Sequence, residues 1–143
     1  MNILDILERK GHDVVTITED RSVLDAARKL VEYGIGGLVV TYDDKPTGII
    51  TERDILRRTA STPGELGTTP VGAAMTRDLV VADPDDGLRE IMEVMTQRRV
   101  RHLPVVRDGQ LLGIVSIGDL IKACLTLAED ENAHLRQYIH GGG

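Results

Sequence analysis

Two segments of this chain carry the same pattern, and this repeat constrains the fold more than any other feature. Residues 48–54 read Gly-Ile-Ile-Thr-Glu-Arg-Asp, and residues 113–119 read Gly-Ile-Val-Ser-Ile-Gly-Asp, 65 positions later. The same offset relates apolar positions further upstream, which include Val15 and Val80, Val23 and Leu88, Leu38 and Leu103, and Val40 and Val105. Two copies of one supersecondary unit predict two similar surfaces that face each other, with clefts between them.

Each copy is expected to follow the order strand, helix, strand, strand, helix. In the first copy, β-branched runs predict strands, helical spacing of apolar residues predicts a helix, and hydroxyl side chains mark helix starts. The predicted elements are a strand at 14–17, a helix from Ser22 to Gly34, strands at 37–41 and 47–50 around a turn, and a helix from Thr51 to about Ala60.

The second copy repeats this order with its own local chemistry. Asp108-Gly109 is a strong hairpin signal, and Leu88, Ile91 and Met95 form the inward stripe of a helix. The predicted elements are a strand at 79–82, this helix, strands at 103–106 and 111–115, and a closing helix after Ser116. Residues 71–75 are expected to form a short helical turn, and residues 3–7 the matching lead-in helix of the first copy.

These elements predict an α+β protein. A strand-helix-strand crossover plus a hairpin gives each copy a small mixed sheet with helices on one face. Because such a sheet leaves an open apolar face, we expect two βαββα repeats packed sheet to sheet about a pseudo-twofold axis, plus a C-terminal helix. The expected boundaries are the first repeat with its lead-in helix at 1–60, a linker at 61–70, the second repeat at 71–122, and a helical extension with a Gly tail at 123–143.

Composition argues against several classes of partner. A net charge of −6 disfavours DNA or RNA, and the chain has three Tyr, no Phe and no Trp on which bases could stack. No apolar run approaches the length of a membrane span, and no signal-peptide pattern opens the chain. One cysteine cannot form an internal disulfide, which fits a reducing compartment. The sequence therefore predicts a cytoplasmic protein without nucleic-acid or membrane partners.

No catalytic or metal-binding constellation stands out in the sequence. The four histidines are scattered without metal-ligand spacing, and Cys124 stands among apolar residues of a predicted helix. Neither a Gly-x-Ser-x-Gly elbow nor a phosphate-binding Gly-x-x-x-x-Gly-Lys loop occurs. We therefore expect a protein that is not an enzyme and requires no metal or cofactor.

The doubled motif resembles a known family. Two copies that each end in Gly-apolar-apolar-Thr/Ser-x-x-Asp, with Arg101-His102-Leu103-Pro104-Val105-Val106 in the second, are similar to a pair of cystathionine-β-synthase (CBS) domains, the Bateman module. The resemblance covers about residues 1–122. It implies a regulatory sensor of adenosine nucleotides, with AMP favoured and ADP, ATP, NAD and S-adenosylmethionine as the other ligand classes. It also implies a homodimer and an unknown regulated protein as partners.

Each motif also has an interpretation as an ordinary helix cap. A hydroxyl at the N-cap and an acid three residues later start a helix without any ligand. The same arrangement directs helix N-terminal amides at a cleft, which suits a phosphate, and a carboxylate there can accept both hydroxyls of a ribose. Two alternatives therefore stand beside the sensor. One is a CBS-fold interaction scaffold. The other is a redox regulator of thioredoxin-type partners, which is implied by the resemblance of residues 133–142 to stand-alone family members. Neither depends on nucleotide.

The resemblance assigns roles to the matching positions of this chain. Asp54 and Asp119 would bind two riboses, and Thr51 and Ser116 would contact phosphate. The adenine pockets would be lined by Thr16, Ile17, Val81 and Ala82 at the strand entries and by Leu38, Leu103 and Pro104. For these wall residues, plain core packing is the competing interpretation.

The resemblance also implies two unequal sites. Asp54 would face Arg101-His102 of the opposite copy, with Arg53 from its own motif. Asp119 would face Gly36-Gly37 and has a glycine beside it. We therefore expect the Asp54 site to be rich in cations and the Asp119 site to lack them. On that basis the Asp54 site should bind a phosphorylated nucleotide more tightly.

The closing helix carries an apolar stripe beyond the second copy. Its members are Leu120, Ile121, Cys124, Leu127, Ala128, Leu135, Tyr138 and Ile139. A helix that extends past its own domain has little left there to cover, so self-association is its natural use. We expect a homodimer in which this helix supports the contact or offers a partner surface.

Overall fold

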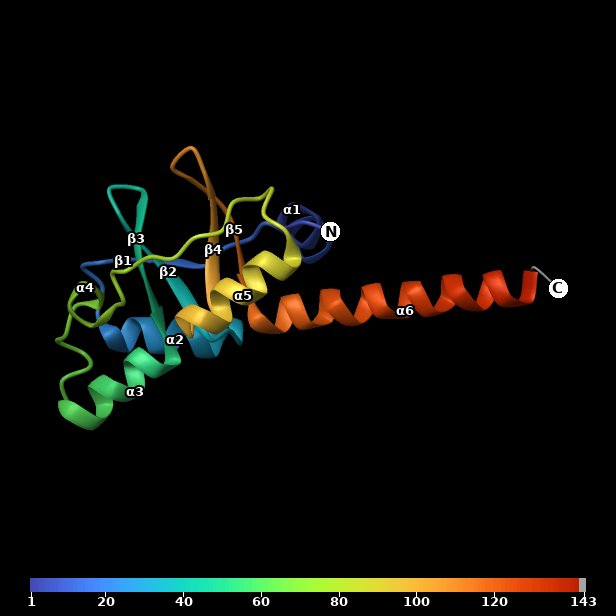
Figure 1. The fold of residues 1–143 in the computed structure, drawn as a ribbon. Coiled ribbons are helices and arrows are strands. Elements are labelled where there is room, and N and C mark those ends of the chain that lie inside the picture. The colour runs from blue at the N-terminus through green and yellow to red at the C-terminus, as the bar shows by residue number, and fades with distance from the viewer. Residues whose placement is uncertain (142–143) are drawn as a thin grey trace.

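Two small β-sheets carry the two copies (Figure 1). The computed structural model describes the backbone of residues 1–141 and the side chains of residues 1–132. Its elements in chain order are α1 (Ile3–Lys10), β1 (Thr16–Thr18), α2 (Val23–Tyr33), β2 (Gly37–Tyr42), β3 (Lys45–Thr51), α3 (Glu52–Ser61), α4 (Val71–Ala74), α5 (Leu88–Arg98), β4 (His102–Arg107), β5 (Gln110–Ser116) and α6 (Ile117–Gly141). The predicted α+β class, with a C-terminal helix, is confirmed.

The sheets share their topology and their irregularities. In the first copy the strand order is β1-β2-β3, with β1 parallel and β3 antiparallel to β2, and in the second copy β4 and β5 form the corresponding hairpin. Each hairpin has one register shift, between Val40 and Thr41 and between Val105 and Val106, again 65 positions apart. β3 contacts β5 where the sheets meet, and both hairpin turns lie on the same side of the protein (Figure 1).

The strand expected at 79–82 shortens to a single parallel bridge at Ala82. Ala82 makes two backbone hydrogen bonds of 2.9 Å with β4, but the next ladder bonds on either side would need N–H groups from Pro104 and Pro84. In the first copy Glu19 stands where the second has Pro84, and its N–H donates to β2 at 3.1 Å. Two prolines therefore remove a strand that the first copy keeps.

Local capping explains where the helices of the first copy begin and end. Ser22 accepts a hydrogen bond from Asp25 N and caps α2, and Gly34 ends that helix in the left-handed conformation, with φ 63°. Thr51 caps α3, which runs to Ser61. The predicted bounds of both helices are therefore confirmed to within one residue.

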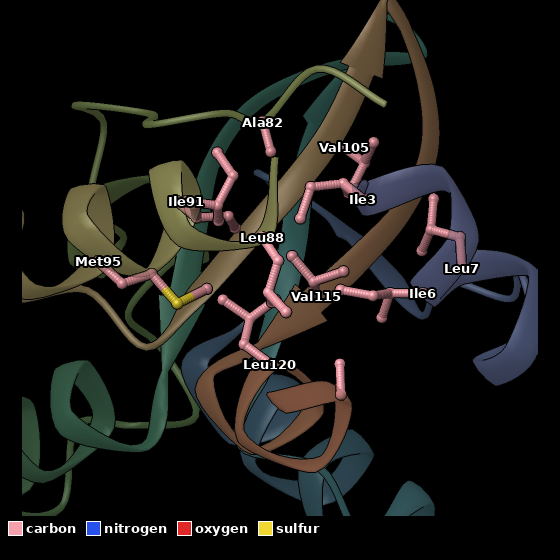
Figure 2. Close-up of a cluster of buried hydrophobic side chains, with 12 residues drawn as sticks. Ile3, Ile6, Leu7, Ala82, Leu88, Ile91, Met95, Val105, Val115 and Leu120 are labelled. Carbon is pink, nitrogen blue, oxygen red and sulfur yellow. The ribbon is translucent and has the colours of Figure 1, made fainter. Parts of the chain in front are cut away.

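The two short helices that precede the repeats pack on the opposite repeat. α1 comes before the first copy in sequence, yet Ile3, Ile6 and Leu7 are buried in the hydrophobic cluster of the second copy, beside Val115 (Figure 2). α4 comes before the second copy, yet Val71 is buried in the cluster of the first. Each repeat thus completes its hydrophobic core with the short helix that precedes the other repeat in the sequence.

The glycine that opens each motif makes room for these helices. A Cβ at Gly113 would lie 2.7 Å from Leu7 Cδ2. A Cβ at Gly48 would lie 2.6 Å from Thr76 O and 3.0 Å from Met75 Sδ. Both distances are shorter than a side-chain carbon tolerates, so the repeated glycine has a packing reason that is independent of any ligand.

Helix α6 continues beyond the second copy and projects from the body of the protein (Figure 1). Ile121 and Leu125 near its start are 48% and 60% exposed. The predicted stripe residues Leu135, Tyr138 and Ile139 lie outside the residues whose side chains are described. Among the described residues, no helix combines the length and apolar character that crossing a membrane requires.

Candidate functional site

Asp54 lies at the N-terminus of α3 with only 7% of its side chain exposed. Its carboxylate accepts hydrogen bonds from Thr51 N at 2.9 Å and Thr51 Oγ1 at 3.2 Å, and Asp54 N donates to the same hydroxyl at 3.4 Å. Thr76, which follows α4, donates its hydroxyl to Asp54 Oδ1 at 3.3 Å, and Arg57 Nη1 lies 3.9 Å from that oxygen. The first motif therefore forms a complete capping box, and Thr76 from the segment after α4 covers it.

Asp119 has the same position at the N-terminus of α6, but 24% of its side chain is exposed. Its carboxylate accepts from Ser116 N at 2.8 Å, and Asp119 N donates to Ser116 Oγ at 3.2 Å. Lys10 Nζ, at the end of α1, donates to Asp119 Oδ2 at 2.6 Å. Burial opposes ionisation of Asp119, but the hydrogen bonds from Lys10 and Ser116 outweigh it and hold its pKa below the usual value.

The Lys10 contact corrects the expectation that the Asp119 site lacks cations. Lys10 is 109 positions away in the sequence, and it reaches Asp119 because α1 packs against β5 and α6. Thr76 reaches Asp54 in the corresponding way, because α4 packs against α3. The carboxylate of each motif thus accepts a hydrogen bond from a residue at or just after the end of a lead-in helix. At Asp54 the donor is a hydroxyl, and at Asp119 it is an ammonium group.

Arg53 and Arg101 line one open depression of about 450 Å³, together with Arg99. Arg53 lies in the first turn of α3 and Arg101 directly precedes β4, so the cations come from both copies. Among the ion pairs of the described residues, none involves these three arginines. Unpaired guanidinium groups gathered in one hollow attract an anion. The structure therefore brings together the two arginines that the sequence argument selected.

His102 lies against the glycines of the first copy. A Cβ at Gly37 would be 3.3 Å from His102 Cγ, and one at Gly36 would be 3.3 Å from His102 Cε1. Burial lowers the pKa of His102, positive neighbours lower it further, and acidic neighbours partly oppose them. These charged neighbours are Lys10, Glu52, Asp119 and Arg101. Acidic residues of both copies, Glu52 and Asp119, thus act on His102, and the expectation that His102 faces the Asp54 site stays a prediction.

Most of the predicted adenine-wall residues are core residues. The buried members are Ile17, Leu38, Ala82, Leu103 and Pro104. Thr16 is half-buried in β1, and its carbonyl accepts from Lys29 Nζ at 2.7 Å. Val81 is 44% exposed and lines a separate depression between the two hairpin turns. Core packing accounts for the buried side chains, so a ligand at these positions would meet mainly backbone atoms.

Both copies match one family model. The model described as "CBS domain" matches residues 5–61 and residues 71–126. The chain belongs to the CBS domain family. This CBS pair is 34% identical over 149 residues to "CBS domain-containing protein CBSX3, mitochondrial" of Arabidopsis thaliana, an alignment that covers 98% of this chain and 72% of that protein.

Solved structures of CBS proteins have the same fold. A CBS-domain-containing protein from Agrobacterium tumefaciens is 41% identical, with a TM-score of 0.82, and the match covers 86% of this chain and 98% of that one. The CBS domain pair of protein MJ0100, in complex with 5′-methylthioadenosine and S-adenosyl-L-methionine, is 26% identical, with a TM-score of 0.77 and coverage of 86% and 94%. Adenosine-containing ligands therefore bind at least one CBS pair with this architecture.

In this CBS pair, sequence reasoning missed Lys10 and Thr76. Neither residue belongs to the repeated motif, and each reaches an aspartate through a helix that packs on the opposite repeat. The one available signal was positional, because both residues come at the end of, or just after, a lead-in helix. Their chemistry differs, and this difference separates the two sites.

Proposed function

We propose that this CBS pair is a regulatory module, not an enzyme, which binds an adenosine nucleotide such as AMP between its repeats. The observation that carries the proposal is the carboxylate of Asp119. It is partly exposed, sits at the N-terminus of a helix, and has cations near it. ADP, ATP, NAD and S-adenosylmethionine are the other ligands to test, since each contains the adenosine group that this proposal requires.

The chemistry of the site fits the two polar parts of a nucleotide. A carboxylate accepts hydrogen bonds from both vicinal hydroxyls of a ribose, and it does so strongly because it is charged. Phosphate favours helix N-termini and guanidinium groups, and Arg53 and Arg101 supply guanidinium groups from the two repeats. We assign Ser116 and Asp119 to the ribose end of the ligand and these arginines to its phosphates.

Asp119 is the better candidate for the tighter site, in contrast to the expectation from sequence. That expectation rested on an absence of cations around Asp119, and Lys10 removes this premise. Asp54 is nearly buried and already accepts hydrogen bonds from Thr51 and Thr76. A ligand would have to displace Thr76 there and reach a carboxylate that is only 7% exposed, against 24% at Asp119, where Oδ1 accepts no hydrogen bond from the described residues.

The redox alternative is weaker. Cys124 is a free, half-buried thiol, and its sulfur lies 3.3 Å from Met92 Sδ beside the second hydrophobic cluster. This packing favours a structural role for the thiol. Reduced thiols persist in the cytoplasm, which we keep as the expected compartment.

Signalling through a homodimer is part of the proposal. The projecting helix α6 exposes Ile121 and Leu125, and exposed apolar side chains on an unpartnered helix favour association with a second copy or with a regulated protein. A ligand at Asp119 would directly contact the N-terminus of this helix, because Asp119 lies in its first turn.

Calorimetric titration with AMP, ATP, NAD and S-adenosylmethionine tests the nucleotide proposal. Asp119→Asn should weaken AMP binding by roughly 10- to 100-fold, the range expected for loss of a charged hydrogen-bond partner. Asp44→Asn, at an exposed hairpin turn, is the matched control and should bind as the wild-type protein does. Absence of binding by every ligand would favour the interaction scaffold, in which both motifs serve only as helix caps.

A further inference from the structure

Lys10 occupies the carboxylate that the proposed ligand needs. Its Nζ donates to Asp119 Oδ2 at 2.6 Å and to Ile114 O at 2.7 Å, and 32% of its side chain is exposed. Asp119 Oδ2 also accepts from Ser116 N. Among the described residues, all hydrogen bonds to this carboxylate go to that one oxygen. A ribose would therefore meet one open oxygen and one that is shared with a cation.

The backbone that carries Lys10 is fixed. Ile6 and Leu7, on the last turns of α1, are 4% and 0% exposed in the hydrophobic cluster of the second copy (Figure 2). Moving α1 away from the site would expose these side chains to water. A ligand can therefore reposition the flexible side chain of Lys10 but cannot remove its charge from the site.

We propose that Lys10 is a specificity-determining residue, which makes the Asp119 site select phosphorylated adenosine over adenosine itself. This inference rests on the proposed function. When ribose hydroxyls bind Asp119, they compete with Lys10 for the carboxylate, and the partly desolvated ammonium group then needs another anion. A phosphate supplies that anion. A neutral nucleoside leaves the ammonium group poorly paired, and a net cationic ligand adds repulsion.

The other motif lacks this selection. At Asp54 the corresponding contact is made by the neutral hydroxyl of Thr76. The cation beside that carboxylate, Arg57 Nη1 at 3.9 Å, belongs to a side chain that is 71% exposed and stays hydrated when a ligand takes the carboxylate. Arg101 and His102 also lie near Asp119, but among the described residues neither donates to its carboxylate, whereas Lys10 Nζ does so at 2.6 Å. Lys10 is therefore the cation that loses its partner when a ribose binds Asp119, and it adds to the preference for phosphate that Arg53 and Arg101 support.

Titration calorimetry on the full chain with two probes, AMP and adenosine, tests this inference. In the wild-type protein AMP should bind more tightly than adenosine, and the preference should shrink as salt concentration rises. In Lys10→Met the ratio of the two affinities should fall roughly tenfold or more. Lys10→Arg keeps the charge and should keep the preference. Lys45→Met, at an exposed position in the hairpin of the first copy, should change neither affinity.

The outcomes separate the two proposals. An unchanged ratio in Lys10→Met, with AMP still bound, overturns the role of Lys10 and leaves nucleotide binding intact. Failure of the wild-type protein to bind either probe overturns both. A thermal melt of each variant checks folding, and if Lys10→Met is unfolded, Lys10→Gln compared with Lys10→Arg decides the question by the same ratio.

Discussion

The hydroxyl of Thr76 donates to the carboxylate of Asp54 at 3.3 Å and joins the segment after α4 to the first turn of α3. This contact couples the segment after α4 to the start of a helix in the first repeat. Asp54 is also the one buried charged residue among those described, so its hydrogen bonds bear on the stability of the first repeat.

Asp54→Asn should lower the free energy of unfolding by about 2 kcal/mol, because the variant loses a charged N-terminal cap and a buried hydrogen-bond network. Thr76→Val should cost about 1 kcal/mol, since it removes one partner of that network. Urea denaturation measures both. Asp13→Asn, at an exposed position, is the control and should leave the midpoint unchanged. A wild-type midpoint for Asp54→Asn would contradict a structural role for this carboxylate.

The two motif glycines should differ in their tolerance of a methyl group. Gly48→Ala places a Cβ 2.6 Å from a backbone oxygen, whereas Gly113→Ala places one 2.7 Å from the end of the flexible Leu7 side chain. Overpacking of this kind costs about 1–3 kcal/mol, and we expect Gly48→Ala near the upper value and Gly113→Ala near the lower. Thermal melts of the two variants give the comparison.

Gly67→Ala is the control for this pair. Its Cβ would meet Leu24 Cδ2 at 3.7 Å, an ordinary contact, and its backbone does not have positive φ. The substitution should leave stability within about 0.5 kcal/mol of wild type, as for surface changes without strain. Equal losses of stability for Gly48→Ala and Gly113→Ala would contradict the expectation that a clash with backbone costs more than a clash with a flexible side chain.

His102 predicts a loss of stability in mild acid. Its folded-state pKa lies below the ordinary value of 6.5, so the unfolded chain binds the proton more readily than the folded protein. The free energy of unfolding should therefore fall as the pH drops from about 6.5 through the lowered pKa, with no further contribution from this group below it.

Urea denaturation of His102→Gln at about pH 7.5 and about pH 5 measures this contribution, and the variant should lose less stability between the two than wild type does. His12→Gln is the control, since His12 is exposed. The charged groups that face His102 are Lys10, Glu52, Asp119 and Arg101. An unchanged pH slope in His102→Gln would exclude His102 as its source.

The exposed start of α6 predicts a dimer contact. Leu125 is 60% exposed, and Leu125→Glu should shift the protein toward monomer, because a charge placed in an apolar interface loses hydration. Light scattering across a micromolar concentration series follows the change. Lys122→Gln, an exposed neighbour on the same helix, should leave the oligomeric state as it is. A wild-type monomer throughout the series would remove the dimer from the proposal.

Local signals in the sequence were sufficient for most of the secondary structure. Ser22 and Gly34 mark the two ends of α2 as predicted, and Thr51 caps α3. The shortened strand at Ala82 was also accessible in principle, because Pro84 and Pro104 are visible in the sequence and neither can donate to a ladder. Its loss depends on the register of the parallel pair, and register is set by packing rather than by local preference.

The sequence by itself determined the duplication, the α+β order of each copy and the two capping boxes. Tertiary structure alone decided which segment closes each carboxylate. α1 is an amphipathic helix and α4 a short apolar one, and each buries apolar side chains against the opposite repeat. Because of this exchange, Lys10 donates to Asp119 and Thr76 donates to Asp54, and two sites with one shared motif acquire different hydrogen-bond partners.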